Sequence, residues 1–187
     1  MTGPLAALAS ALLAATVAQT PLPSTPPCFP AGAHIGDFET RWFCGQLAAA
    51  GKGRLDGPTA YRLVYLPSFR PAKIVEVRQE RSGWMIQTTI LSGMGGGPPG
   101  DIRERRQRWL TADDVLDLEA AVNRSGVWRP DTRVHSNVLD DSTLVLEAVQ
   151  PATHRVHMVA ASAKDDLPLK DLCERLRAMA GIDDLEK

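Results

Sequence analysis

The order of strand-like segments constrains the fold of this chain more than any other feature. Four such runs follow one another without a helical pattern between them, at residues 60–66, 73–80, 84–91 and 102–110. Short polar connections such as Arg81-Ser82-Gly83 separate them, which is typical of hairpin turns. Two more runs flank Pro151, at residues 143–149 and 155–161. The pattern predicts a four-strand meander plus a hairpin, in a largely antiparallel sheet of about six strands.

Three other segments have the apolar spacing of amphipathic helices, at residues 37–50, 111–126 and 168–180. Asp37 is the expected N-cap of the first helix and Thr111 that of the second. In the third, Cys173 and Leu176 belong to an apolar stripe that we expect to face the core. Strands grouped in a meander, with three helices around them, predict the α+β class.

The N-terminus carries an uncharged run of apolar and small residues, 5–18, that ends in Thr16-Val17-Ala18. This run is too short to span a bilayer as a helix, and its end resembles a signal-peptidase site. We predict a signal peptide over residues 1–18, a proline-rich leader over 19–34 and a single α+β domain over 35–187. The alternatives are a buried N-terminal helix or a membrane anchor, because residues 1–4 contain no Lys or Arg.

The formal net charge of −1 gives no reason to expect general binding to nucleic acid or to an anionic membrane. Beyond residue 18 no second apolar run approaches the length of a membrane span. We therefore expect the mature chain to be soluble, not membrane-spanning, periplasmic or secreted, and without a nucleic-acid partner.

Three cysteines follow the predicted cleavage point: Cys28, Cys44 and Cys173. In an oxidising compartment, one pair is expected to form a disulfide. Cys28–Cys44 is the preferred pair, because it ties the leader to the first helix; Cys44–Cys173 is the alternative. Cys173 lies in an apolar helical stripe, which predicts a buried and inert thiol.

The connection between the third and fourth strands is rich in glycine, with five glycines in residues 92–100. One interpretation is a hairpin loop; the other is a nest of backbone N–H groups that binds an anion. Neither a dinucleotide fingerprint nor a P-loop is present, because the segment does not lead from a strand into a helix. The candidate binding residues are Gly95, Gly96, Gly97 and Gly100.

Four arginines follow this loop, at Arg103, Arg105, Arg106 and Arg108. Polar residues on both faces of a strand are typical of a charged edge strand. The functional alternative is a docking surface, in which guanidinium groups and the glycine loop together hold a carboxylate or phosphate. These residues and the glycines form the predicted binding surface.

A carboxylate and an imidazole in the second hairpin, Glu147 and His157, are candidates for acid–base chemistry. The structural interpretation is a solvated cross-strand pair of Glu147 with His157 or Arg155. His154 and His157 point to opposite faces of a strand, which is poor for joint metal ligation. No zinc spacing and no Gly-x-Ser-x-Gly motif occurs in the chain, so we predict neither a metal nor a cofactor.

Across residues 38–181 the chain resembles a widespread group of uncharacterised secreted bacterial proteins. The resemblance rests on Tyr61-Arg62, Phe69 with Pro71, Gly95-Gly96 with Pro99-Gly100, Trp128, and Asp141 ahead of Leu146-Glu147. The chain departs from the group at Ser142-Thr143, where a bulkier, more aromatic stretch is typical. The resemblance implies an exported bacterial protein and assigns no catalytic residue.

These observations predict an exported, non-catalytic protein of a binding or inhibitor type that recognises an envelope protein or component. One rival is an envelope hydrolase that uses Glu147 and His157, which requires both groups in one pocket. Another is a purely structural envelope protein, which requires a large exposed apolar face.

Overall fold

The computed structural model describes residues 28–33, 35–134, 138, 140–163 and 167–182. The predicted signal peptide and residues 19–27 of the predicted leader lie outside the described residues.

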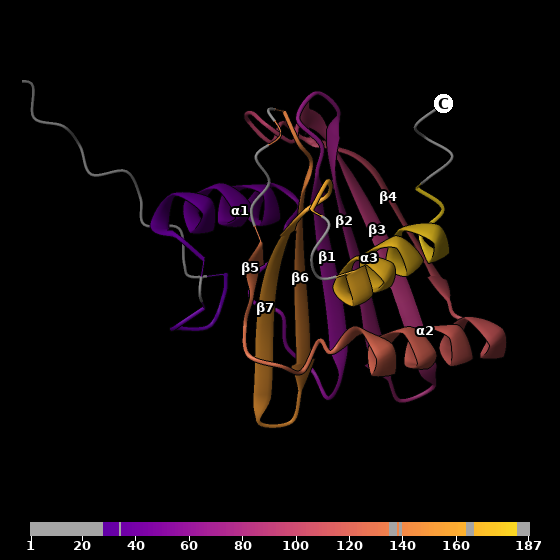
Figure 1. The fold of residues 1–187 in the computed structure, drawn as a ribbon. Helices are drawn as coiled ribbons and strands as arrows, with labels where there is room; N and C mark the ends of the chain where they lie inside the picture. The colour runs from indigo at the N-terminus through magenta and orange to yellow at the C-terminus, as the bar shows by residue number, and fades with distance from the viewer. Residues whose placement is uncertain (1–27, 34, 135–137, 139, 164–166, 183–187) are drawn as a thin grey trace, which may run out of the picture.

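The described chain forms a seven-stranded sheet with the order β4-β3-β2-β1-β6-β7-β5 (Figure 1). The strands are β1 (Ala60–Leu66), β2 (Pro71–Glu80), β3 (Gly83–Met94), β4 (Ile102–Trp109), β5 (Arg133–Val134), β6 (Thr143–Gln150) and β7 (Thr153–Ala160). All neighbours pair antiparallel except β5, which runs parallel to β7. The predicted meander, hairpin and α+β class are confirmed. The additional strand, β5, has two residues, too few to show an alternating pattern in the sequence.

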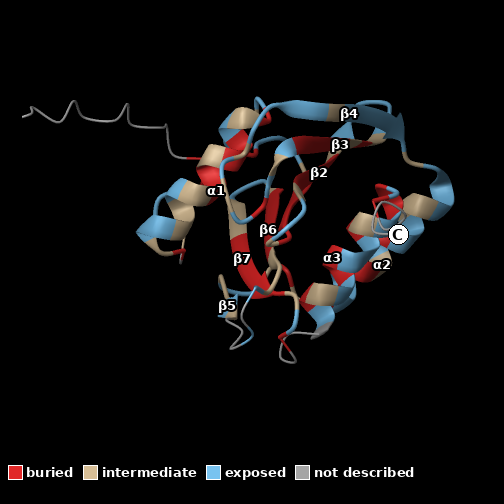
Figure 2. Cartoon of the chain, turned by 90° about the horizontal axis from the view of Figure 1, so that it is seen from above, coloured by how far each residue is buried: buried red, intermediate tan, exposed pale blue. Residues whose placement is uncertain are grey.

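In the described part of the chain, three helices cover the sheet: α1 (Asp37–Ala49), α2 (Ala112–Ser125) and α3 (Leu167–Met179). The sheet bends, with α2 and α3 in the angle that it forms and α1 on the other face (Figure 2). Thr111 caps α2 as predicted, in a capping box with Asp114. The N-cap of α1 is Gly36 rather than Asp37, which is the first helical residue. No helix of the described residues is both long and apolar enough to cross a membrane.

Each face of the sheet has its own hydrophobic core. The core beneath α2 and α3 contains Tyr61, Leu63 and Tyr65, whereas Val64 and Leu66 face α1. Every residue of β1 is buried, because this strand lies in the middle of the sheet with a covered face on each side. Any charged side chain on β1 is therefore buried as well.

The cysteines behave as predicted. Cys28 and Cys44 form a disulfide with Cα atoms 5.4 Å apart, which joins the segment before α1 to the helix itself. Cys173 is free and fully buried in the core of α3. Burial raises the pKa of its thiol to about 12. A disulfide is compatible with an extracytoplasmic location.

Candidate functional site

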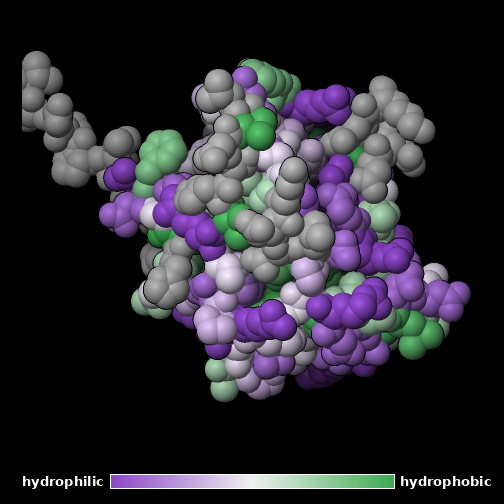
Figure 3. Space-filling model, in the orientation of Figure 1, coloured by the Kyte–Doolittle hydropathy of each residue, from purple (hydrophilic) through white to green (hydrophobic). Residues whose placement is uncertain are grey.

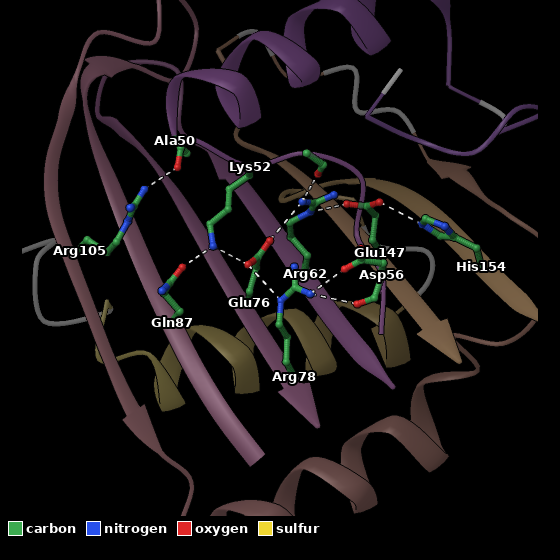
Figure 4. A network of polar contacts seen from close by, with 11 residues as sticks. Ala50, Lys52, Asp56, Arg62, Glu76, Arg78, Gln87, Arg105, Glu147 and His154 are labelled. Carbon is green, nitrogen blue, oxygen red and sulfur yellow. Dashed lines mark hydrogen bonds and ion pairs between the residues drawn. The ribbon is translucent and has the colours of Figure 1, made fainter. Parts of the chain in front are cut away.

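A buried ionic cluster is centred on Arg62, on the face of β1 that is covered by α1 and residues 50–59 (Figure 4). The strand register places Glu76 of β2 and Glu147 of β6 opposite Arg62 on either side. Arg62 Nε donates to Glu147 Oε2 at 2.5 Å, and Nη1 donates to Glu76 Oε1 at 3.2 Å and to the Gly53 carbonyl at 2.8 Å. Arg62 and Glu147 are both 0 % exposed. One guanidinium thus contacts two carboxylates inside the protein.

Lys52 and Arg78 complete this cluster on its outer side. Lys52 Nζ lies 2.6 Å from Glu76 Oε2 and also donates to the Gln87 side chain, and Arg78 Nε lies 3.5 Å from the same carboxylate oxygen. Burial opposes ionisation of Glu76, but the charges of Lys52, Arg62 and Arg78 outweigh it, so the pKa of Glu76 is lowered. Glu76 therefore stays ionised at neutral pH and has no proton to donate as a general acid.

A polar cleft of about 310 Å³ lies over this outer side and is lined partly by Lys52, Glu76, Arg78 and Gln87. Its charged groups are already paired: Lys52 and Arg78 both contact Glu76, and Arg78 also pairs with Asp56. Removing one partner of such a buried pair is costly. These ion pairs are best explained as structural contacts that hold residues 50–59 against the sheet.

The structure does not bring together Glu147 and His157, the pair considered for hydrolysis. Glu147 faces α1, whereas His157 pairs with Leu146 in the register and faces α2 and α3. Its Nε2 lies 2.8 Å from the Val127 carbonyl, and its Nδ1 accepts the Thr132 N–H at 3.3 Å. The expected solvated pair is also wrong, because both side chains are fully buried and Glu147 contacts Arg62 and His154 instead.

The predicted basic strand is the edge strand β4, with side chains that alternate between the two faces as expected. Arg105 donates to the carbonyl of Ala50, where α1 ends (Figure 4). On the other face, Arg106 donates to the carbonyls of Ala180 and Gly181, and Arg108 to that of Met179, where α3 ends. The last carbonyls of a helix lack intrahelical partners and carry partial negative charge. Three of the four arginines thus act as caps for two helices.

The predicted glycine loop packs closely against the connection between β1 and β2. Gly95 N–H donates to the Arg70 carbonyl at 2.8 Å, and a Cβ at Gly95 would lie 2.5 Å from the Pro67 carbonyl oxygen. Gly93 and Gly97 donate to Pro99 and Met94 within the loop. Several N–H groups that an anion nest would need are therefore already bonded within the protein. Gly96 and Gly100 also approach neighbouring atoms closely, and a Cβ at either would lie within 3.0 Å of them.

An aromatic cleft is the second cavity of interest, between α2 and the ends of the central strands. Tyr61 from β1, Trp84 from β3 and Trp128 from the segment after α2 form an aromatic cluster. The ring centroids of Tyr61 and Trp84 lie 6.1 Å apart, and those of Tyr61 and Trp128 lie 6.0 Å apart. The cleft has a volume of about 260 Å³, and its remaining lining residues are Leu118, Glu119, Val122, Asn123 and Gln150.

The polar groups of the aromatic cleft lie on its rim. Glu119 and Asn123 are exposed residues of α2, and Trp84 and Trp128 are only partly buried. Burial and, to a lesser extent, the negative charge of Glu119 raise the pKa of Tyr61 to about 12. The Tyr61 hydroxyl is therefore neutral at physiological pH. Glu119 is the one lining residue with a charge.

Sequence reasoning missed both the ionic cluster and the aromatic cleft. An arginine within the apolar run of residues 60–66 is the signal that indicates the cluster, because such a strand is buried on both faces. The cleft has no comparable signal, since Tyr61, Trp84 and Trp128 are far apart in the sequence.

No group of His, Cys, Asp and Glu side chains suited to hold a metal ion is found in the described part of the chain. No model of a known protein family matches the sequence, and no curated protein is significantly similar to it.

Proposed function

We propose that this chain is an exported, non-catalytic binding protein that recognises a protein or another component of the cell envelope through the aromatic cleft. Export is supported by the apolar run of residues 5–18 and by the resemblance to secreted bacterial proteins. The Cys28–Cys44 disulfide agrees with this, since disulfides persist in oxidising compartments.

The observation that carries the proposal is the composition of the aromatic cleft. Ligand sites are concave and mostly apolar, with a few polar groups that orient the ligand. Three aromatic rings with Leu118 and Val122 form the apolar part, and Glu119, Asn123 and Gln150 supply polar groups. Partly buried tryptophans such as Trp84 and Trp128 are also favourable at a binding surface, because they give a large contact area with few rotatable bonds.

Two rival functions have less support. For a hydrolase, Glu147 is fully buried and already accepts from Arg62 and contacts His154, so it is not available to a substrate. For a purely structural protein, a large exposed apolar face is expected, whereas apolar side chains form several separate areas in the view of Figure 3.

The predicted surface of glycine loop and arginines stays a second candidate for the contact. Arg106 and Arg108 line a cleft of about 270 Å³ beside the end of α3. An anion there would compete with the carbonyls of Met179 and Ala180 for the same guanidinium groups. The aromatic cleft carries no such competition and is the preferred site.

The test is affinity capture with the mature protein from the envelope fraction of its own host, followed by mass spectrometry of the bound material. Trp128→Leu alters the cleft, and Trp109→Leu is the matched control, since Trp109 is 54 % exposed on β4. We expect the first variant to lose the bound component and the second to retain it. Capture that survives Trp128→Leu but is lost when Arg105 and Arg106 are both replaced by Gln would move the site to the other surface.

Export has its own test. Mass spectrometry of the protein made in its host is expected to find an N-terminus near Gln19. A chain that retains Met1 in the cytosolic fraction would contradict export. Of the proposal, only binding through the aromatic cleft would then remain.

A further inference from the structure

The face of β1 that carries Tyr61 holds two aromatic environments that differ in charge. Two cations lie over the ring of Tyr65, with Lys73 Nζ 5.4 Å and the Arg177 guanidinium 4.5 Å from its centroid. Both cations come from the protein itself. Attraction between a cation and the face of an aromatic ring is thus already part of this core.

Tyr61, which lines the aromatic cleft, lies four residues before Tyr65 on the same face of β1. Among the described residues, no Lys or Arg is positioned over the rings of Tyr61, Trp84 or Trp128. Arg155 Nε donates to the backbone carbonyl of Trp128 at 3.3 Å and not to its ring. The cluster therefore combines three electron-rich rings with no protein cation over them.

The charge of the cleft favours a positive ligand. Those of its lining residues that the structure describes include one carboxylate, Glu119, and no cationic side chain. Glu119 acts electrostatically on the Tyr61 hydroxyl, which places negative potential beside the rings. Aromatic faces bordered by a carboxylate are the arrangement by which proteins hold quaternary ammonium and other organic cations.

We propose that the aromatic cleft binds an organic ammonium ion. The rings contact the methyl or methylene groups around the nitrogen, and Glu119 balances the charge. This inference rests on the proposed function, because it assigns a ligand class to the same cleft. The two tryptophans of the lining favour a cation over an apolar ligand of equal size, since Trp has the strongest cation–π interaction of the aromatic residues.

The experiment compares charged probes with uncharged probes of the same shape, in full-length mature protein at constant ionic strength. Choline is paired with its carbon analogue, in which a tert-butyl group replaces trimethylammonium. Nα-acetyl-lysine amide, whose side chain ends in an ammonium group, is paired with Nα-acetyl-norleucine amide, whose side chain lacks it. Binding is followed by tryptophan fluorescence and by the indole N–H resonances of Trp84 and Trp128, with that of Trp109 as the internal control.

We expect at least one charged probe to bind about tenfold more tightly than its uncharged partner. Preference for choline indicates a free quaternary ammonium ligand, and preference for the lysine amide indicates a lysine side chain of a protein partner. Glu119→Gln is expected to weaken the charged probe by about tenfold and to leave the uncharged probe unchanged. Glu119 is an exposed residue of α2, so this variant should fold. Glu174→Gln, on exposed α3 surface, is the matched control.

Equal binding of the charged and uncharged probes, with no effect of Glu119→Gln, would overturn the cation inference and leave the cleft as a binding site. Absence of binding by both charged probes would also overturn it. The proposed function is judged separately, because the capture experiment depends on Trp128 and on no chosen ligand.

Discussion

Arg62 and Glu147 lie directly opposite one another on β1 and β6, and their fully buried side chains are joined by a hydrogen bond from Arg62 Nε to Glu147 Oε2. Glu76, opposite Arg62 on β2, completes the contact from the other side. These residues connect three neighbouring strands through their side chains, and Lys52 links them to the segment after α1. The cluster is therefore expected to influence stability more than any surface ion pair.

Replacing one partner of this contact tests its structural role. Glu147→Gln is expected to lower the free energy of unfolding by about 3–5 kcal/mol, because it removes one of the two buried carboxylates that balance the cations Arg62, Lys52 and Arg78. Urea denaturation measures the change. Asp117→Asn is the control, since Asp117 pairs with Arg175 at 3.4 Å and the two side chains are 58 % and 45 % exposed; its effect should be below about 0.5 kcal/mol. Equal effects of the two variants would contradict a structural role of the cluster.

The lowered pKa of Glu76 predicts sensitivity to acid. In the unfolded chain a Glu carboxyl titrates near 4.3, so on acidification the unfolded state takes up a proton before the folded state does. The stabilisation from ionised Glu76 is complete above that pH and is lost as the pH falls through the lower folded pKa. Urea midpoints measured from pH 6 downward should decline, and the decline should be shallower in Glu76→Gln. Parallel curves for the two proteins would show that Glu76 does not contribute.

The third helix offers a test of the core. Leu176 is 0 % exposed, and Leu176→Ala is expected to cost about 2–5 kcal/mol through lost apolar contact and a residual cavity. Leu116→Ala on α2 is the matched control, because Leu116 is 64 % exposed and its truncation should cost much less. A loss under about 0.5 kcal/mol at Leu176 would mean that α3 does not pack as described.

The disulfide is expected to stabilise the fold, and the free thiol is expected to be unreactive in the folded protein. Cys28→Ser with Cys44→Ser is expected to lower the free energy of unfolding by about 3 kcal/mol, since the bond closes a loop of 16 residues in the unfolded chain.

The Cys173 thiol should react with a thiol reagent only after denaturation, because it is buried and its pKa is raised to about 12. Rapid labelling of Cys173 in the native protein would contradict its burial.

Substitutions at two glycines in the connection between β3 and β4 test whether this loop is closely packed or simply flexible. Gly95→Ala places a methyl group 2.5 Å from the Pro67 carbonyl, and we expect a cost of about 1–3 kcal/mol from the required displacement. A Cβ at Gly97 would lie 3.9 Å from the Met94 carbonyl oxygen, so Gly97→Ala should be tolerated. Thermal unfolding of the two variants gives the comparison, and equal midpoints would show that the loop has room to move.

Much of the fold follows from local patterns in the sequence. Alternation in residues 73–80 places Glu76 and Arg78 on one face of a strand, and Thr111 and Gly126 mark the ends of α2. These features depend on the period of a strand and on the chemistry of helix ends, which act over a few residues. The edge position of β4 was predicted in the same way, from charges on both of its faces.

The role of each charged or aromatic residue was decided by tertiary structure. Arg105 and Arg106 formed part of a predicted ligand surface, yet each lies beside the end of a different helix and donates to carbonyls there. The sequence does not contain that information, because the helix ends lie 55 and 74 residues away along the chain.

Local patterns in the sequence specify every element except β5, together with their order and the faces they bury, because apolar periodicity and capping are local properties of the chain. Which elements meet depends on tertiary packing: the sheet register joins Arg62 to Glu147 and turns His157 to the opposite face, and the packing of α2 gathers Tyr61, Trp84 and Trp128 around one cleft. Contacts between residues far apart in sequence depend on how the sheet bends and how the helices dock on it, and no short-range pattern records either.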